Sequence, residues 1–271
     1  MMRYAYRTVL GFLLAVAIAF PASAAVVTSW DYSYNAGFSS WTMETGKDSI
    51  FHDGLTTAGY NNVNGVSTYS QLWWGSGNAL FQTNPRSGIV LGTPVNGIVD
   101  TNGASAGAMT MTHFNNPVYG NTLLSGTVTA ALELSARDPY NGAANVLSTQ
   151  LEFAFYETPN VGGNIADVFI LTNPGVTTEG FEYDGEWYTL DFTGSFGLIP
   201  ESYIALLKLD TSISYYGWVT EEGVTTSVDT SFTISHVQQP TPTPEPATFV
   251  LLALGLGTLV GASRLRRRDV A

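Results

Sequence analysis

The side chains best suited to chemistry in this chain are Thr112, His113 and Asn115, which follow a stretch of alternating, strand-like character. A hydroxyl, an imidazole and a side-chain amide can each donate and accept hydrogen bonds, so the three could hold a ligand or fasten a loop. Asn116-Pro117 comes next and favours a turn, because a proline disfavours helical conformation in the residue before it. We therefore place the segment at the end of a strand and favour a structural fastening over a binding role.

Acidic side chains offer a second kind of chemistry, since two carboxyl groups can serve a glycosidase as acid and base. Glu152 with Glu157, or Glu182 with Asp184 and Glu186, are close in the sequence. Such a pair needs a separation of about 5–10 Å across a cleft, which spacing along the chain does not establish. Asp184 is explained by an Asp-Gly turn, and we favour solvent-facing positions for the other acids.

The sequence contains no motif typical of a metal site or an activated nucleophile. The three histidines, His52, His113 and His236, show neither His-x-His nor His-Glu-x-x-His spacing, and there is no cysteine. No Gly-x-Ser-x-Gly elbow supports a Ser-His-Asp triad, and residues 138–141 are a poor substitute for a calcium-binding loop. We predict that the protein is not an enzyme and has no catalytic residue, no metal site and no cofactor.

Two adjacent tryptophans, Trp73 and Trp74, are candidates for ligand binding. Neighbouring residues of a strand point to opposite faces, so one indole should enter the core and the other should meet solvent or a loop. An exposed indole could stack on a sugar ring, but we favour core filling and edge protection for this pair. Other aromatic residues that could join such a surface are Trp41, Tyr69, Trp187, Tyr215 and Tyr216.

Strands must position all of these side chains, because the local pattern is β almost throughout. Residues 151–155 alternate between large apolar and smaller or polar side chains, as a half-buried strand does. Residues 181–192 form the clearest hairpin, with Asp184-Gly185 as the preferred two-residue turn. Further strands are expected at residues 66–74, 88–91, 122–134, 166–172 and 231–236, and turns at Asn64-Gly65, Asn96-Gly97, Asn102-Gly103 and Asn141-Gly142. With only residues 203–209 of helical character, we predict an all-β domain over residues 25–237, a β-sandwich of jelly-roll type.

The net charge of this domain argues against nucleic acids and anionic lipids as partners. The chain has 10 basic and 22 acidic residues. Leaving out the residues of the two ends (Arg3, Arg7, the four arginines of the tail, Glu245 and Asp269) gives four basic and 20 acidic residues, a net charge near −16. Such a surface repels nucleic acids and anionic lipids. Without cysteine, the domain must rely on a hydrophobic core rather than on disulfides.

Both ends of the chain carry targeting features. Residues 1–24 are typical of a secretory signal, with Arg3 and Arg7, an apolar stretch at residues 9–20 and a small-residue site for signal peptidase after Ala24. About 12 apolar residues are too few to span a bilayer, which needs about 20. At the other end we predict a proline-rich spacer (residues 238–246), an apolar helix that holds the unprocessed chain in the membrane (residues 247–263) and a basic cytoplasmic tail (residues 264–271).

The tail resembles the PEP-CTERM sorting signal. Pro244, Glu245 and Pro246 precede the apolar helix, and Arg264, Arg266, Arg267 and Arg268 follow it. The resemblance implies an exosortase as partner, a membrane-embedded enzyme similar to cysteine transpeptidases in Gram-negative bacteria that make exopolysaccharide. It also implies cleavage near the Pro-Glu-Pro element and a cell-surface or extracellular location after processing.

The domain itself resembles the THxN family of PEP-CTERM proteins. Residues 112–115 fit the Thr-His-x-Asn signature, and residues 155–160, 167–171 and 181–185 are similar to further blocks of that family in the same order. The resemblance covers most of the domain and implies anchoring and architecture but no reaction, because the family has no established biochemical activity. Some members carry cysteines where this chain has residues 161–164, so no cross-link is expected there.

Together these features predict an exported, exosortase-processed protein of the cell surface or extracellular matrix, which is not an enzyme and associates with exopolysaccharide in a biofilm. A carbohydrate-binding module that recognises exopolysaccharide is the alternative. A glycan-acting hydrolase is a distant third.

Overall fold

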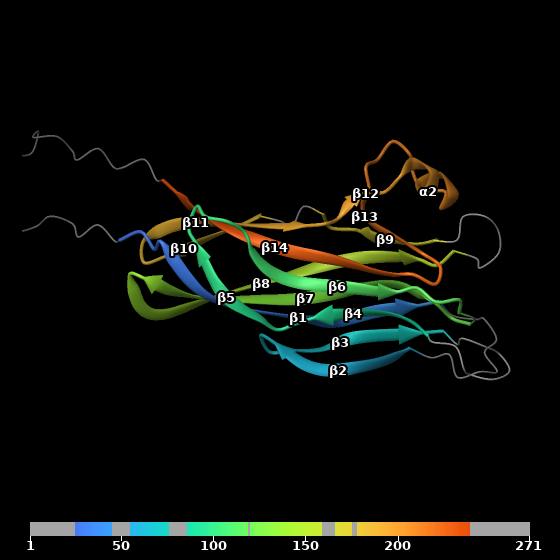
Figure 1. The fold of residues 1–271 in the computed structure, drawn as a ribbon, viewed down its shortest axis with the longest axis horizontal. Helices are drawn as coiled ribbons and strands as arrows, with labels where there is room; N and C mark the ends of the chain where they lie inside the picture. Colours follow the sequence, from blue (N-terminus) through green and yellow to red (C-terminus); the bar gives the residue numbers. More distant parts are fainter. Residues whose placement is uncertain are drawn as a thin grey trace, which may run out of the picture. The chain divides into compact units, whose positions relative to one another are not determined.

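The computed structural model describes residues 25–44, 55–75, 86–118, 120–158, 166–174 and 178–238, and most of these lie in strands (Figure 1). The chain divides into two compact units, Met1–His236 and Val237–Ala271, and the sheet belongs to the first. The strands are β1 (Ser29–Met43), β2 (Thr56–Val63), β3 (Val66–Trp74), β4 (Ser87–Gly92), β5 (Val95–Asp100), β6 (Ala106–Phe114), β7 (Leu123–Asp138), β8 (Tyr140–Tyr156), β9 (Ala166–Leu171), β10 (Thr178–Tyr183), β11 (Glu186–Gly194), β12 (Gly197–Leu198), β13 (Tyr216–Glu221) and β14 (Thr225–Val237). Between β12 and β13 lies the short helix α2 (Glu201–Leu206).

The described strands belong to one antiparallel sheet that curls over itself. Its order is β10-β11-β14-β6-β4-β3-β1-β7-β8-β9-β13-β12, with β2 on β3 and β5 on β1. Strands far apart in this order meet across the core: Trp30 of β1 packs edge-on against Phe181 and Tyr183 of β10, with ring centroids 5.8 and 4.9 Å apart. Two parts of the sheet therefore face each other as the layers of a sandwich do. The all-β prediction is confirmed, and one continuous curled sheet supplies both layers.

Alternation along the long strands builds the core. In β1 the side chains at every second position from Trp30 to Phe38 are buried, and in β7 the same holds from Val128 to Ala136. All six residues of β9 are buried. A second, smaller core explains this, because Ile199 and Ile204 pack against apolar side chains of β9 that do not belong to the main core.

The predicted hairpin at residues 181–192 is confirmed. β10 and β11 pair directly, and Asp184 and Gly185 both have positive φ, 51° and 80°, as a type I′ turn requires. Asn64-Gly65 joins β2 to β3 in the same way, with φ of 47° and 85°. Asparagine, aspartate and glycine tolerate this left-handed conformation better than other residues, which is why these turns could be predicted.

Three local predictions need correction. The pair Asn141-Gly142 lies inside β8 rather than in a turn, because the turn between β7 and β8 is at Pro139. A turn at Asn96-Gly97 is wrong, because both residues lie inside β5, where a Cβ at Gly97 would lie 2.8 Å from the ring of Tyr32. The glycine serves close packing there rather than a turn. The helix expected at residues 203–209 instead occupies Glu201–Leu206, and Lys208 already has a left-handed φ of 57°.

Several predicted features lie outside the described residues. They are the signal peptide (residues 1–24), all but the first residue of the spacer (residues 238–246), the apolar helix (residues 247–263) and the basic tail (residues 264–271). Within the described ranges, no helix has the length and apolar character needed to cross a membrane.

Candidate functional site

The sheet brings four separate stretches of the sequence together in one group of polar side chains. We define the polar cluster as His113, Asn115, Glu157, Thr158, Asp167 and Thr220. His113 lies at the end of β6 and Asn115 directly after it, Glu157 and Thr158 follow β8, and Asp167 and Thr220 lie on β9 and β13. Asp167 and Thr220 are directly opposite in the β9–β13 ladder, so their side chains lie on the same face of the sheet.

Asp167 is the centre of the polar cluster and is only 1% exposed. Its Oδ1 accepts a hydrogen bond from the backbone N–H of Thr158 at 3.0 Å, and its carboxyl group contacts that of Glu157. The Nε2 of His113 lies 3.9 Å from Asp167 Oδ2. Two carboxyl groups in contact inside a protein repel each other when both are ionised, so one of them keeps its proton.

Burial sets the protonation states of this group. It raises the pKa of Asp167 to about 9, with the charge of Glu157 as the next cause, while the hydrogen bond from Thr158 acts in the opposite direction. Burial also lowers the pKa of His113 to about 3. At neutral pH, Asp167 is therefore a neutral acid beside a neutral imidazole, and their 3.9 Å contact is not an ion pair.

Aromatic rings hold His113 in place. Trp74 stacks on the imidazole, with ring centroids 5.9 Å and planes 16° apart, and Phe155 meets it edge-on at 5.1 Å. The indole N–H of Trp74 donates a hydrogen bond to Oε2 of Glu157 at 3.1 Å. The polar cluster and the surrounding core are therefore one packed unit, in which a change at one side chain affects several others.

Asn115 ties the end of β6 to the turn between β13 and β14. Its Nδ2 donates to the backbone carbonyl of Thr220 at 2.8 Å. Its own N–H donates to the carbonyl of Val224 at 3.1 Å, and its carbonyl accepts from the N–H of Gly223 at 2.8 Å. These three hydrogen bonds fix the end of β6 to β13 and to the turn after it, as expected of residues with a structural role.

The other residues of the Thr-His-x-Asn segment lie on the opposite face of β6. The hydroxyl of Thr112 is 2.9 Å from that of Ser227 on β14. Phe114 packs against Trp73, with ring centroids 5.4 Å apart. The alternation of the strand therefore divides the segment, and Thr112 does not belong to the polar cluster.

Several atoms of the polar cluster are buried without a hydrogen bond. Among the described residues, none partners the ring nitrogens of His113, the Oδ1 of Asn115, or the hydroxyls of Thr158 and Thr220. Each buried group of this kind costs about 1–3 kcal/mol of stability. No three described His, Asp or Glu side chains are arranged to hold a metal ion. The cluster can hold a proton and order the packing, and the side chains of His113 and Asp167 are closed to solvent.

The acids considered from the sequence lie apart from this group, with one exception. Glu152, Glu182 and Asp184 are exposed to solvent. Glu186 meets His236, with Oε2 and Nε2 2.8 Å apart. The exception is Glu157, which contacts Asp167.

The sequence analysis did not identify Asp167 as a site residue, although the sequence of β9 sets this residue apart. Asp167 is the only charged residue in β9, and the other five residues of that strand are apolar and buried. A lone acid in a strand buried on both faces needs a partner or a proton. Thr220 gives no comparable signal, because only the β9–β13 register brings it opposite Asp167.

The two adjacent tryptophans occupy different environments. Trp74 is fully buried and stacks on His113, so its ring offers no face to a sugar. Trp73 is half-buried, and its indole N–H donates to Oε1 of Gln71 at 3.0 Å. Core filling accounts for Trp74, and its burial removes it from any ligand-binding surface.

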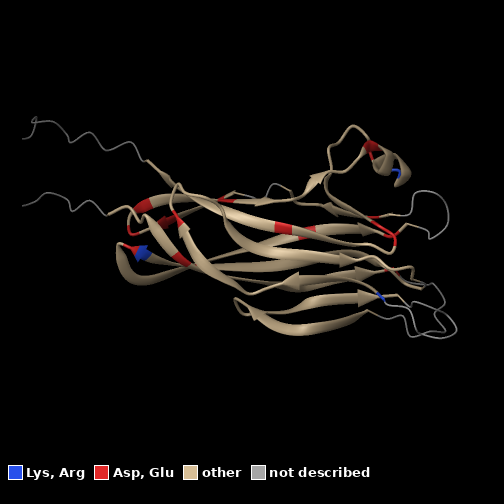
Figure 2. Cartoon of the chain, viewed as in Figure 1, with Lys and Arg blue, Asp and Glu red and all other residues tan. Residues whose placement is uncertain are grey.

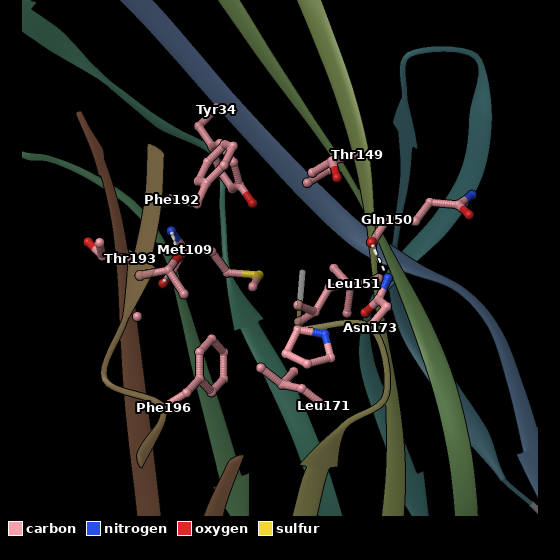
Figure 3. Close-up of a pocket in the computed structure, with 15 residues that line it drawn as sticks. Tyr34, Met109, Thr149, Gln150, Leu151, Leu171, Asn173, Phe192, Thr193 and Phe196 are labelled. Atoms are coloured by element: carbon pink, nitrogen blue, oxygen red, sulfur yellow. Dashed lines mark hydrogen bonds between the residues drawn. The ribbon is translucent and has the colours of Figure 1, made fainter. Parts of the chain in front are cut away.

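A separate cavity of about 80 Å³ lies between β8 and β11 (Figure 3). Apolar side chains dominate its lining, among them Leu151, Phe192 and Phe196. Burial raises the pKa of Tyr34, which also faces the cavity, so its phenol stays neutral at ordinary pH. The described residues that line it include no aspartate, glutamate, histidine, lysine or arginine.

Comparison with known proteins identifies the end of the chain, which lies beyond the described residues. Residues 242–268 match the PEP-CTERM protein-sorting motif. This chain carries an exosortase sorting signal. The matched stretch includes the predicted Pro-Glu-Pro element and all four arginines from Arg264 to Arg268, and it implies export and processing by an exosortase at the cell surface. No curated protein matches the chain.

Proposed function

We propose that the mature protein is a non-enzymatic component of the cell surface or extracellular matrix of a Gram-negative bacterium, a member of the THxN family that associates with exopolysaccharide in a biofilm. The observation that carries this proposal is the sorting motif at residues 242–268, which implies delivery to an exosortase. A signal peptide in residues 1–24 would start export and be removed by signal peptidase after Ala24.

The burial of the polar cluster supports a structural rather than a catalytic role. A general acid or base must come within hydrogen-bond reach of the proton it transfers. The side chains of His113 and Asp167 are both 0% exposed, so a substrate in solvent cannot reach either of them. The hydrogen bonds of Asn115 and the stack of His113 on Trp74 give these residues a role in packing instead.

The convergence of separate sequence blocks supports membership of the THxN family. His113 and Asn115 come from the signature, Glu157 and Thr158 from the block at residues 155–160, and Asp167 from the block at residues 167–171. All of them meet in the polar cluster. One packed unit therefore gives a physical reason for these blocks to occur together.

The location of the protein in its native host, with and without the exosortase, tests the proposal. With the enzyme present, the protein should leave the inner membrane and appear at the cell surface or in the matrix together with exopolysaccharide. Without the enzyme, it should stay in the inner-membrane fraction, since the apolar helix and the arginines would still hold it there.

A pair of variants sharpens this test. Glu245→Ala changes the Pro-Glu-Pro element and should slow release, whereas Asp269→Ala removes an acid just outside the matched residues and should have no effect. A location that does not depend on the exosortase, or equal behaviour of the two variants, would contradict the proposed processing.

A further inference from the structure

Two neighbouring strands of the sheet have no charged side chain of their own, and among the described residues Arg86 meets them at one end, where its guanidinium donates to Thr56. β2 and β3 contain no Asp, Glu, Lys or Arg, and neither does β1 from residue 32 onward. Acidic residues lie on other elements, among them β5, β10, β11 and β14 (Figure 2). In a domain with a net charge near −16, the surface of β2 and β3 differs from the rest.

Three aromatic side chains meet on this surface, and we refer to Trp41, Tyr69 and Tyr60 as the aromatic row. Tyr60 and Tyr69 are directly opposite in the β2–β3 ladder, with ring centroids 5.8 Å apart. Trp41 of β1 packs against Tyr69 at 6.0 Å. Tyr60 is 65% exposed and the other two are half-buried, so the row runs from the edge of the core to solvent.

Amide and hydroxyl groups surround the aromatic row. Asn62 lies on the same face of β2 as Tyr60 and its Oδ1 accepts from the N–H of Gly65 at 2.9 Å, and the hydroxyls of Tyr60 and Ser67 are 3.2 Å apart. Tyr, Ser, Gly and Asn dominate residues 59–70. Antibody binding loops use the same residue types, because rigid aromatic rings lose little entropy on contact and short polar side chains adapt their hydrogen bonds.

From this combination we infer that the surface around the aromatic row binds a neutral polysaccharide. The C–H face of a sugar ring is apolar and packs on an aromatic ring, while its hydroxyls exchange hydrogen bonds with amides and hydroxyls. Neither contact needs a charged side chain, and β2 and β3 contribute none. An acidic polymer, in contrast, would be repelled by the charge of the whole domain.

This inference rests on the proposed association with exopolysaccharide and gives it a chemical basis. The competing occupant is a second copy of the chain. Among the described strands β2 pairs only with β3, so its other edge has backbone groups that could pair with a further strand. The aromatic rings and the side-chain amides favour the sugar, because pairing between strand edges uses backbone groups and needs neither.

Electrophoresis in native gels that contain a polysaccharide tests the inference on protein purified from its native host. The probes are three neutral polymers, dextran, mannan and a β-glucan, and one acidic polymer, alginate. At least one neutral polymer should retard the wild-type protein, and alginate should not. Tyr60→Ala should weaken the retardation about tenfold or more, because one aromatic anchor often supplies much of the binding energy of such a surface. Since Tyr60 is 65% exposed, the variant should fold normally.

Trp187→Ala is the matched control. Trp187 is also an exposed aromatic residue, 41% accessible, but it lies on β11 next to Glu186. This variant should bind like the wild type. Retardation by none of the three neutral polymers, or equal retardation of Tyr60→Ala and wild type, would overturn the inference, as would loss of a dimer in Tyr60→Ala without a change in glycan binding. A protein that reaches the cell surface but binds no neutral glycan would overturn this inference alone and leave the proposed location standing.

Discussion

Replacing Asp167 with asparagine should remove a large part of the pH dependence of folding stability above pH 6.5. The folded protein holds a proton on Asp167 up to a pH of about 9, because the carboxyl group is buried beside Glu157. In the unfolded chain an aspartate loses that proton near pH 4. The folded state therefore binds more protons than the unfolded state in this range, and the contribution of Asp167 to stability falls as the pH rises.

The size of the effect follows from the two pKa shifts of the polar cluster. Between about pH 4 and pH 6.5, the unfolded chain protonates His113 while the folded chain, with a His113 pKa of about 3, does not, so the two residues have opposite effects that cancel. Of these two residues, only Asp167 still changes the stability above pH 6.5, and Glu222, whose pKa burial also raises, acts in the same direction as Asp167. A slope of about 1.4 kcal/mol per pH unit then predicts a loss of about 3 kcal/mol between pH 6.5 and pH 9.

Urea unfolding of wild type and Asp167→Asn at several pH values between 6 and 9 measures this loss. Asparagine has the shape of the protonated acid, so the two proteins should have similar free energies of unfolding only below about pH 4, and the variant should already be the more stable at pH 6. Its advantage should then grow by about 3 kcal/mol more between pH 6.5 and pH 9. Glu152→Gln, which removes an exposed acid from β8, controls for the general effect of charge. Parallel curves for wild type and Asp167→Asn would refute the argument that Asp167 is a buried neutral acid.

Three further changes test the packing of the polar cluster. His113→Ala should lower the free energy of unfolding by about 2 kcal/mol, because the stack on Trp74 is lost and a cavity remains. Export of this variant should stay intact. Normal urea unfolding of the variant together with loss of partner binding would argue for a binding role instead. Asn115→Ala should cost about 2 kcal/mol, because the buried carbonyl of Thr220 loses its donor, and faster deuterium exchange at Gly223 would locate the change. Removal of divalent cations with EDTA should leave the thermal unfolding midpoint of the wild-type protein unchanged. A large decrease in this midpoint would contradict the prediction that the protein has no metal site.

The parts of the fold that could be predicted from the sequence are those with local causes. The hairpin around Asp184-Gly185 follows from two residues that accept positive φ between alternating strands. The turn expected at Asn96-Gly97 failed for a non-local reason, since Gly97 is needed for the ring of Tyr32 on another strand. The pairing of β1 with both β7 and β5 is likewise invisible to local pattern, because it joins residues far apart in the sequence.

The candidate site, too, could be predicted from the sequence only where its causes are local. His113 and Asn115 could be singled out by their types and by the proline after Asn116, which places them at a strand end. Their contacts could not be predicted, because Asp167 and Thr220 reach them only through the register of β9 and β13. The burial of Trp74 rather than Trp73 depends on which face of β3 meets the core, and alternation alone leaves that choice open.

The central claim is that this chain is an exported protein processed at its C-terminal sorting motif. Intact-mass spectrometry of the mature protein from its native host tests it most directly, since one measurement reports both ends and any attached group. The account predicts a chain that begins at residue 25 and ends near residues 244–246, without the apolar helix and the arginines. A mature protein that retains residues 247–268 would contradict it.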